Sequence, residues 1–299
     1  MSRGVKTGIV LDHRGLLSLS DIPITQLRDF FRRLVQKRRD SVTRASRVQS
    51  PVGCLAFFEN STRTLTSFEK AGLDLGLRWI HFDPSLSSLS KGESLEESFK
   101  SLAELDPSFF VVRHSEPGFA HWVQHWTQKP VFNAGDGRHQ HPTQALGDAW
   151  TLWKQDLKSG SVAFFGDVEN SRVARSSGFL FKKLGYRVSV VNDGRPQTLL
   201  FSKAMGFRLL ARDKLPSQKI VFVLRAQKER GGHSALGPLL KKELGRGSYW
   251  MHAGPVIENE DVEWALCRFE DENSLVRQQV RACYEVRYRL LADLFEGSR

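Results

Sequence analysis

The chain has 299 residues, of which 40% are hydrophobic, and this is enough for one large domain or two medium ones. No stretch approaches the roughly 18 consecutive apolar residues of a membrane span, and the first residues lack the apolar core of a secretory signal. The three scattered cysteines, Cys54, Cys267 and Cys283, have no CxxC spacing. We therefore expect reduced thiols in a cytoplasmic protein, with no metal site.

The net charge of +11 is compatible with binding to nucleic acid, acidic lipid or small polyanions, and does not choose among them. The densest basic run, residues 28–39, lies in the first predicted helix, 22–39. Apolar residues recur there with helical spacing, so the basic residues line the outer side of the helix. A solvated face is the simplest interpretation, and a docking surface for an acidic partner is the alternative.

Beyond this helix, strand and helix patterns alternate along the chain. Predicted strands lie at 52–58, 78–82, 108–112 and 130–133, and predicted helices at 62–75, 95–105, 119–126 and 142–157. A second set has strands at 161–165, 187–191, 207–210, 219–224 and 248–251, and helices at 173–184 and 274–295. The alternation predicts two open parallel-sheet α/β domains bridged by helices. We place the first domain at 1–140 and the second at 141–282, with the C-terminal helix, 283–299, packing back on the first.

The most informative stretch is Ser61-Thr62-Arg63-Thr64, which follows the apolar run 52–58 and opens a helical pattern. The first turn of a helix has unpaired N–H groups and the positive end of the helix dipole. Three hydroxyls and a guanidinium at that point would make a phosphate site. Ser and Thr are also ordinary N-cap residues, so these positions alone leave both interpretations open.

Polar residues follow most of the other predicted strands as well. Those at the strand ends of the first domain are Arg113, His114, Asn133, Asp136, His141 and Gln144. Those of the second domain are Arg172, Arg225, Gln227, Arg230, His252, Gly254 and Pro255. Ligands of open α/β sheets bind beyond the carboxyl ends of the strands, so these arginines indicate a cleft for multiply charged small anions.

Other chemistries have less support. Gly166-Asp167 after a strand is found in dinucleotide sites, but the GxGxxG pattern is missing. His141 precedes a proline, and its role could be no more than that of a helix cap. Asp136, between two glycines, could be an ordinary turn residue. No nucleophile–base set and no dense carboxylate cluster stands out. The inventory favours catalysis by positioning and electrostatics, without a cofactor.

The motifs resemble those of the transcarbamoylase family. Ser61-Thr62-Arg63-Thr64, Arg113-His114 and His141-Pro142-Thr143-Gln144 resemble its carbamoyl-phosphate site. The segment from Arg225 to Arg230 and the loop His252-Ala253-Gly254-Pro255 resemble the second domain of the aspartate transcarbamoylases. The resemblance implies transfer of a carbamoyl group from carbamoyl phosphate to L-aspartate, in pyrimidine biosynthesis, with the active site in the interdomain cleft.

The resemblance also implies residue roles. Ser61, Thr62, Arg63, Thr64 and Arg113 would bind phosphate, and Thr64, Arg113 and His141 would polarise the carbonyl. Gln144 and the carbonyls of Ala253 and Gly254, beside a cis Pro255, would hold the carbamoyl amine. Arg172, Arg225 and Gln227 would bind the aspartate carboxylates. Glu59 would pair with Arg172 and Arg230 between the domains.

A polar loop around residues 85–94 concerns assembly. By the same resemblance Ser87 and Lys91 act in a neighbouring subunit's site, which implies a homotrimer with shared active sites at the subunit interface. A regulatory chain and a dihydroorotase are further partners that the resemblance leaves open; we expect no membrane partner and no nucleic acid.

Two alternative functions remain open. The first is a transcarbamoylase with another amino acceptor, because Ala253 stands where the family usually has proline and the segment from Arg230 to His252 is short. The other is a non-catalytic assembly subunit that uses the basic first helix.

Overall fold

The computed structural model describes residues 14–20, 22–35, 50–86, 92–227, 232, 236–258, 260–262 and 272–296. They belong to two compact units, unit 1 within 1–143 and 283–299, and unit 2 within 144–282. In the described residues each unit contains one five-stranded sheet in which every strand pairing is parallel. The predicted α/β fold class with two open parallel sheets is therefore confirmed.

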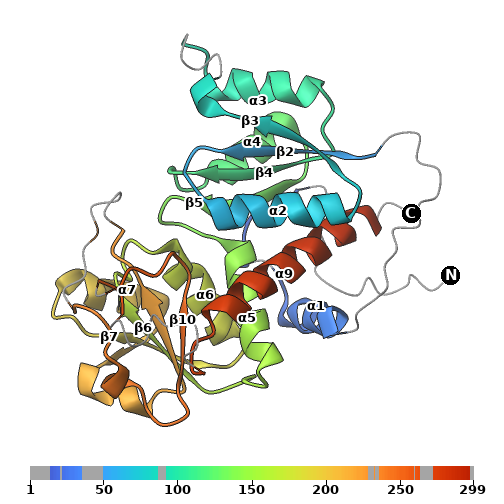
Figure 1. Ribbon diagram of the computed structural model, residues 1–299. Coiled ribbons are helices and arrows are strands. Elements are labelled where there is room, and N and C mark those ends of the chain that lie inside the picture. Colours follow the sequence, from blue (N-terminus) through green and yellow to red (C-terminus); the bar gives the residue numbers. More distant parts are fainter. Residues whose placement is uncertain are drawn as a thin grey trace. The chain divides into compact units, whose positions relative to one another are not determined.

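Unit 1 has its strands in the order β1-β5-β4-β2-β3 (Figure 1). The strands are β1 (Gly15–Leu16), β2 (Val52–Phe57), β3 (Arg78–Phe82), β4 (Phe109–His114) and β5 (Val131–Asp136). The helices are α1 (Ile24–Val35), α2 (Thr62–Asp74), α3 (Leu95–Glu104) and α4 (Phe119–Thr127), with a 3-10 turn η1 (Pro84–Leu86). Two residues are too few to show a strand pattern, which is why β1 was not predicted.

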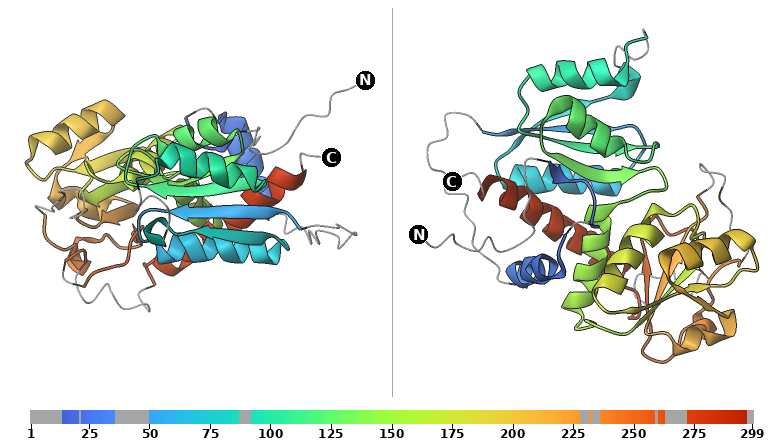
Figure 2. Two further views of the ribbon diagram at one scale, coloured as in Figure 1. Left: turned by 90° about the horizontal axis from the view of Figure 1, so that it is seen from above. Right: turned by 180° about the vertical axis from the view of Figure 1, so that it is seen from behind.

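Aromatic side chains cover both faces of this sheet. On one face, Phe99 of α3 and Phe119 of α4 pack with Phe110 of β4. On the other face, the ring of Phe68 in α2 lies 6.2 Å from that of Phe132 in β5, between centroids. Figure 2 shows α2 on the opposite side of the sheet from α3 and α4. Coverage of both faces explains why β2 and the first four residues of β4 read as continuous apolar runs.

Unit 2 has its strands in the order β10-β9-β6-β7-β8. They are β6 (Ser161–Gly166), β7 (Arg187–Val191), β8 (Arg208–Leu210), β9 (Ile220–Leu224) and β10 (Tyr249–His252). The helices are α6 (Arg172–Lys183) and α7 (Pro196–Met205), with 3-10 turns η3 (Arg212–Ser217) and η5 (Lys241–Glu243). The boundaries of the two units lie inside α5 (Pro142–Lys154) and α9 (Val276–Glu296).

Helix α7 is an element that the apolar pattern did not predict. Its neighbouring Leu199 and Leu200 are 52% and 64% exposed, so its apolar residues do not mark a buried stripe. The residues at its two ends are the better sequence signals of a helix, because Pro196 occupies the first turn and Gly206 ends the helix at φ +62°. Proline at a helix start and glycine at its end are standard capping signals.

The two sheets share one topology, and it positions the candidate site. In unit 1, β2 connects to β3 on one side and β4 connects to β5 on the other, so the strand order reverses between β2 and β4. In unit 2 the same reversal lies between β6 and β9. Open α/β sheets bind ligands beyond the carboxyl ends of the strands at this switch point.

Candidate active site

Helix α2 presents its first turn at the switch point of unit 1. Its first internal hydrogen bond joins the Leu65 N–H to the Ser61 carbonyl, so the N–H groups before Leu65 have no acceptor within the helix. Ser61 is the N-cap residue, yet its side chain makes no capping hydrogen bond. The hydroxyls of Ser94 and Ser171 do cap α3 and α6. Ordinary capping therefore does not account for Ser61, and the anion-site interpretation gains support.

The adjacent strand brings Arg113 to the same edge. The Phe58 N–H donates to the Arg113 carbonyl at 2.9 Å, which joins the ends of β2 and β4. The Arg113 guanidinium lies 3.3 Å from Glu59 Oε2 through Nε and donates to the Ala134 carbonyl through Nη1, also at 3.3 Å. Only 14% of the Arg113 side chain is exposed. The guanidinium is thus held in one orientation beside the start of α2.

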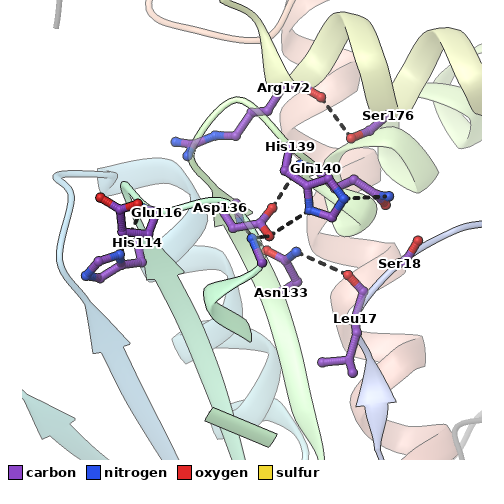
Figure 3. Close-up of polar contacts among 12 residues, drawn as sticks. Leu17, Ser18, His114, Glu116, Asn133, Asp136, His139, Gln140, Arg172 and Ser176 are labelled. Carbon is purple, nitrogen blue, oxygen red and sulfur yellow. Dashed lines mark hydrogen bonds and ion pairs between the residues drawn. The ribbon is translucent and has the colours of Figure 1, made fainter. Parts of the chain in front are cut away.

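His114, the next residue, is part of the aromatic packing below the site. Its ring stacks on Phe119 with centroids 3.8 Å apart, and its Nδ1 accepts the Glu116 N–H at 2.9 Å (Figure 3). Burial lowers the pKa of His114 below the usual histidine value, because the charged ring would lose hydration. The accepted hydrogen bond also requires an unprotonated Nδ1, so His114 is neutral near pH 7.

The turn after β5 is organised by Asp136, a residue whose side chain is only 2% exposed. Its carboxylate accepts the N–H groups of Gly118 and Gln140, both at 2.8 Å, and contacts His139 Nδ1 at 2.9 Å (Figure 3). Three contacts from two segments fix the turn that leads to α5. His141 follows it directly and is itself buried. Asp136 is therefore a turn residue that sets the position of His141.

At the switch point of unit 2, a buried carboxylate joins the ends of β6 and β9. Asp167 Oδ2 accepts the Gln227 N–H at 3.1 Å, and Asp167 Oδ1 accepts Nδ2 of Asn170 at 3.0 Å. Arg225 and Gln227 follow β9, and Arg172 is the first residue of α6. The topology therefore brings these three predicted residues to the same edge of the sheet.

Gly166, at the end of β6, has φ +111°, which is unfavourable for other residues. A Cβ atom at this position would lie 2.1 Å from the Leu224 carbonyl oxygen. The close approach of β9 therefore accounts for this glycine, and no nucleotide is needed to explain it.

The loop after β10 is fixed by His252. Its backbone N–H donates to Gln279 Oε1 at 2.9 Å, and its Nδ1 accepts the Gly254 N–H at 3.1 Å. The predicted cis peptide before Pro255 is wrong, because the described residues contain no cis peptide bond. The trans form is the lower in free energy for an X–Pro bond, by about 0.5–1 kcal/mol.

Comparison with known proteins agrees with these features. Residues 14–154 match the family model described as aspartate/ornithine carbamoyltransferase, carbamoyl-P binding domain. The aspartate carbamoyltransferase catalytic subunit of Deinococcus radiodurans is 38% identical, over 86% of this chain and 86% of its own length. That of Bradyrhizobium diazoefficiens is 36% identical, over 97% of each chain. The chain belongs to the aspartate carbamoyltransferase family.

Solved structures support the same fold. The crystal structure of Trypanosoma cruzi aspartate transcarbamoylase with carbamoyl aspartate and phosphate superposes with a TM-score of 0.77. It is 22% identical and covers 95% of this chain and 96% of its own. The ligand-free form of that protein has a TM-score of 0.71.

Some predicted residues of this family member lie outside the described part of the chain, namely Ser87, Lys91 and Arg230. Glu59 contacts Arg113 within unit 1, a pairing that the sequence did not predict; its pairing with Arg172 and Arg230 stays a prediction. The described residues contain no group of three or more metal-ligating side chains and no helix with the length and apolarity that a bilayer crossing requires.

Proposed function

We propose that this chain transfers the carbamoyl group of carbamoyl phosphate to the α-amine of L-aspartate, giving N-carbamoyl-L-aspartate and phosphate. The observation that carries the proposal is the start of α2 beside Arg113. There, hydroxyls, helix N–H groups and an oriented guanidinium lie at the switch point of unit 1 in a member of the aspartate carbamoyltransferase family.

The phosphate of carbamoyl phosphate binds the first turn of α2. Ser61, Thr62 and Thr64 supply hydroxyls, and Arg63 and Arg113 supply guanidinium donors. Helix N–H groups and arginine forks are the usual partners of phosphate oxygens, and they bind a dianion better than a neutral group. The same donors stabilise the phosphate as it leaves.

The carbonyl oxygen of the substrate is polarised by Thr64, Arg113 and His141. The carbamoyl nitrogen is a donor, and it binds acceptors, namely the Gln144 side chain and the carbonyls of Ala253 and Gly254. A preorganised donor that meets developing negative charge typically contributes about 10²–10³ in rate.

Aspartate binds at the switch point of unit 2. Arg172, Arg225 and Gln227 hold its two carboxylates, and the neutral α-amine faces the carbonyl carbon. The new N–C bond forms, and the C–O bond to phosphate then breaks. The amine proton leaves with phosphate. No covalent enzyme intermediate and no cofactor is required.

We infer that active sites are shared within a homotrimer. Ser87 and Lys91 would enter the site of the neighbouring subunit. Glu59 would pair with Arg172 and Arg230 when the domains close. An inactive Lys91→Ala chain mixed with an inactive His141→Ala chain should then regain activity, because some mixed sites contain both residues. Verified mixed trimers with no regained activity would contradict shared sites.

The proposed compartment is the cytoplasm, and the proposed pathway is pyrimidine biosynthesis. Cys54 is a buried free thiol whose pKa burial raises to about 12, as expected of an unreactive structural thiol in a reducing compartment. Cell fractionation of the natural source tests the compartment.

The deciding experiment measures carbamoyl aspartate formation by the purified chain and by Arg63→Ala. We expect turnover by the parent and a loss of about 10²–10³ in the variant. Arg187→Ala, which removes an exposed arginine of β7, is the matched control and should keep full activity. Turnover with other amino acceptors, measured in a panel, distinguishes a transcarbamoylase of different acceptor specificity from the proposed enzyme. Salt-dependent polyanion binding without any turnover would instead support the non-catalytic assembly subunit.

A further inference from the structure

Helix α5 carries a buried carboxylate, Asp148, one turn after Gln144. Its Oδ1 accepts the side-chain amide of Gln144 at 2.8 Å and that of Gln279 at 2.8 Å. Its Oδ2 accepts the hydroxyl of Ser177 at 2.6 Å. Asp148 is completely buried, and all four residues belong to unit 2. One carboxylate thus connects α5, α6 and α9.

The carboxylate determines which end of each amide faces it. An ionised carboxylate only accepts hydrogen bonds, whereas a glutamine side chain has a donating NH2 group and an accepting oxygen. Gln144 must therefore turn its NH2 group toward Asp148, and its Oε1 points to the other side. The reversed amide would place two oxygen acceptors against each other, and a lost buried hydrogen bond of this kind is costly.

The same rule orients the second amide. Gln279 turns its NH2 group to Asp148, and its Oε1 accepts the His252 backbone N–H at 2.9 Å. His252 in turn accepts the Gly254 N–H through Nδ1. Gln279 and His252 are 2% and 1% exposed. Both ends of Gln279 are therefore fixed, and through Gln279 Asp148 contributes to the position of the loop that contains Ala253 and Gly254.

We propose that Asp148 is a positioning residue that makes this site select a carbamoyl group over an acetyl group. It keeps the Gln144 oxygen available to the substrate NH2 group, and through Gln279 it fixes the loop carbonyls that accept from the same group. The proposal rests on the proposed function. A site whose acceptors match a substrate NH2 group discriminates against an analogue with a methyl group there.

The test compares carbamoyl phosphate with acetyl phosphate, which has a methyl group in place of the NH2 group, and with inorganic phosphate. Affinities are measured by calorimetry and by inhibition of turnover. In Asp148→Leu, carbamoyl phosphate should bind about tenfold more weakly, the effect of about one lost hydrogen bond. Acetyl phosphate and phosphate should stay within about twofold, because their contacts do not include the Gln144 oxygen.

Two variants separate orientation from a merely structural role. Asp148→Asn keeps one oxygen for both glutamines and can donate its NH2 group to Ser177, so it should retain the selectivity of the parent. Thr151→Val, a buried near-isosteric change in the same helix, removes a hydrogen bond to the Gly147 carbonyl outside this network and should also retain it.

A second route is needed if Asp148→Leu does not fold. Gln279→Met keeps the side-chain length but releases the His252 N–H, and should weaken carbamoyl phosphate alone by about threefold. When Asp148→Leu is combined with Gln144→Ala, it should reduce the selectivity for carbamoyl phosphate over acetyl phosphate much less than it does in the parent chain. The reason is that the Gln144 amide, which Asp148 orients, is then already absent.

Equal weakening of all three ligands in Asp148→Leu, or unchanged selectivity in both Asp148→Leu and Gln279→Met, would overturn the proposal. Failure of the proposed function gives a different result, since the unmodified protein would then neither bind carbamoyl phosphate nor form carbamoyl aspartate.

Discussion

The two units have the same sheet topology but build their switch points differently. In unit 1, residues 58–61 connect β2 to α2, and the site is formed by donors, with Arg113 oriented by Glu59. In unit 2, residues 167–171 connect β6 to α6. There the buried carboxylate of Asp167 accepts a hydrogen bond from the backbone N–H of Gln227, in the segment that follows β9. Unit 1 thus uses an acid to orient a cation, whereas unit 2 uses one to hold backbone segments together.

This difference has a functional meaning. A phosphate can be bound by a helix start with little help from distant segments, because most of its donors come from one turn of chain. Two carboxylates of an amino acid require donors from separate segments, and in the proposed function these donors are Arg172 and Arg225. Those segments keep their relative positions only if something joins them, and Asp167 does so, because it accepts hydrogen bonds from the Gln227 backbone after β9 and from the Asn170 side chain just before α6.

The largest effect on activity is expected from a change of Arg113, the arginine that Glu59 orients in unit 1. Arg113→Lys keeps the charge but loses the fork that contacts Glu59 and the Ala134 carbonyl together. We expect carbamoyl aspartate formation to fall about 10²–10³-fold, with the unfolding midpoint nearly unchanged. Steady-state rates and thermal melts check this. Full activity would mean that charge alone suffices there.

The next effect concerns the strand contact of unit 2. Gly166→Ala places a Cβ against the Leu224 carbonyl at a φ of +111°, so we expect a loss of about 2 kcal/mol in the free energy of unfolding. Gly185→Ala is the control, since Gly185 has φ +96° but open space around its Cβ. Urea unfolding should show the control to be clearly less destabilised; equal losses would refute the role of the strand contact.

Asp167→Asn tests the acid that joins the segments of unit 2. An amide at that position accepts the Gln227 N–H more weakly than a carboxylate does. The KM for aspartate should rise about tenfold, while the KM for carbamoyl phosphate should change little. If the two constants rise together, Asp167 supports the whole fold and not the second site.

The smallest effect is the pH dependence due to His114. Its folded-state pKa is lowered by burial, so the unfolded chain binds a proton more readily and stability is lost as the pH falls below about 6.5. His114→Phe keeps an aromatic ring against Phe119 and removes this proton, so its stability should fall less between pH 7.5 and 5.5. His121→Phe, at an exposed position of α4, is the control for replacing a histidine with an aromatic ring.

The sequence predicted the sheets because buried parallel strands leave continuous apolar runs, as in residues 52–58 and 220–224. It predicted the start of α2 because the local order of strand, hydroxyls and helix is sufficient to place it. It did not predict the Asp148–Gln279 bond, which joins residues 131 positions apart, nor the pairing of Glu59 with Arg113. Such contacts depend on how helices and strands pack, and no local pattern encodes them.

The central claim is that unit 1 binds the phosphate group and unit 2 binds aspartate. Calorimetric titration of inorganic phosphate into the parent chain, Arg113→Ala and Arg225→Ala tests it most directly. The account predicts that Arg113→Ala weakens phosphate binding by about tenfold or more, the loss of one guanidinium donor, and that Arg225→Ala keeps phosphate binding while losing aspartate turnover. Phosphate binding that is unchanged in Arg113→Ala and lost in Arg225→Ala would contradict it.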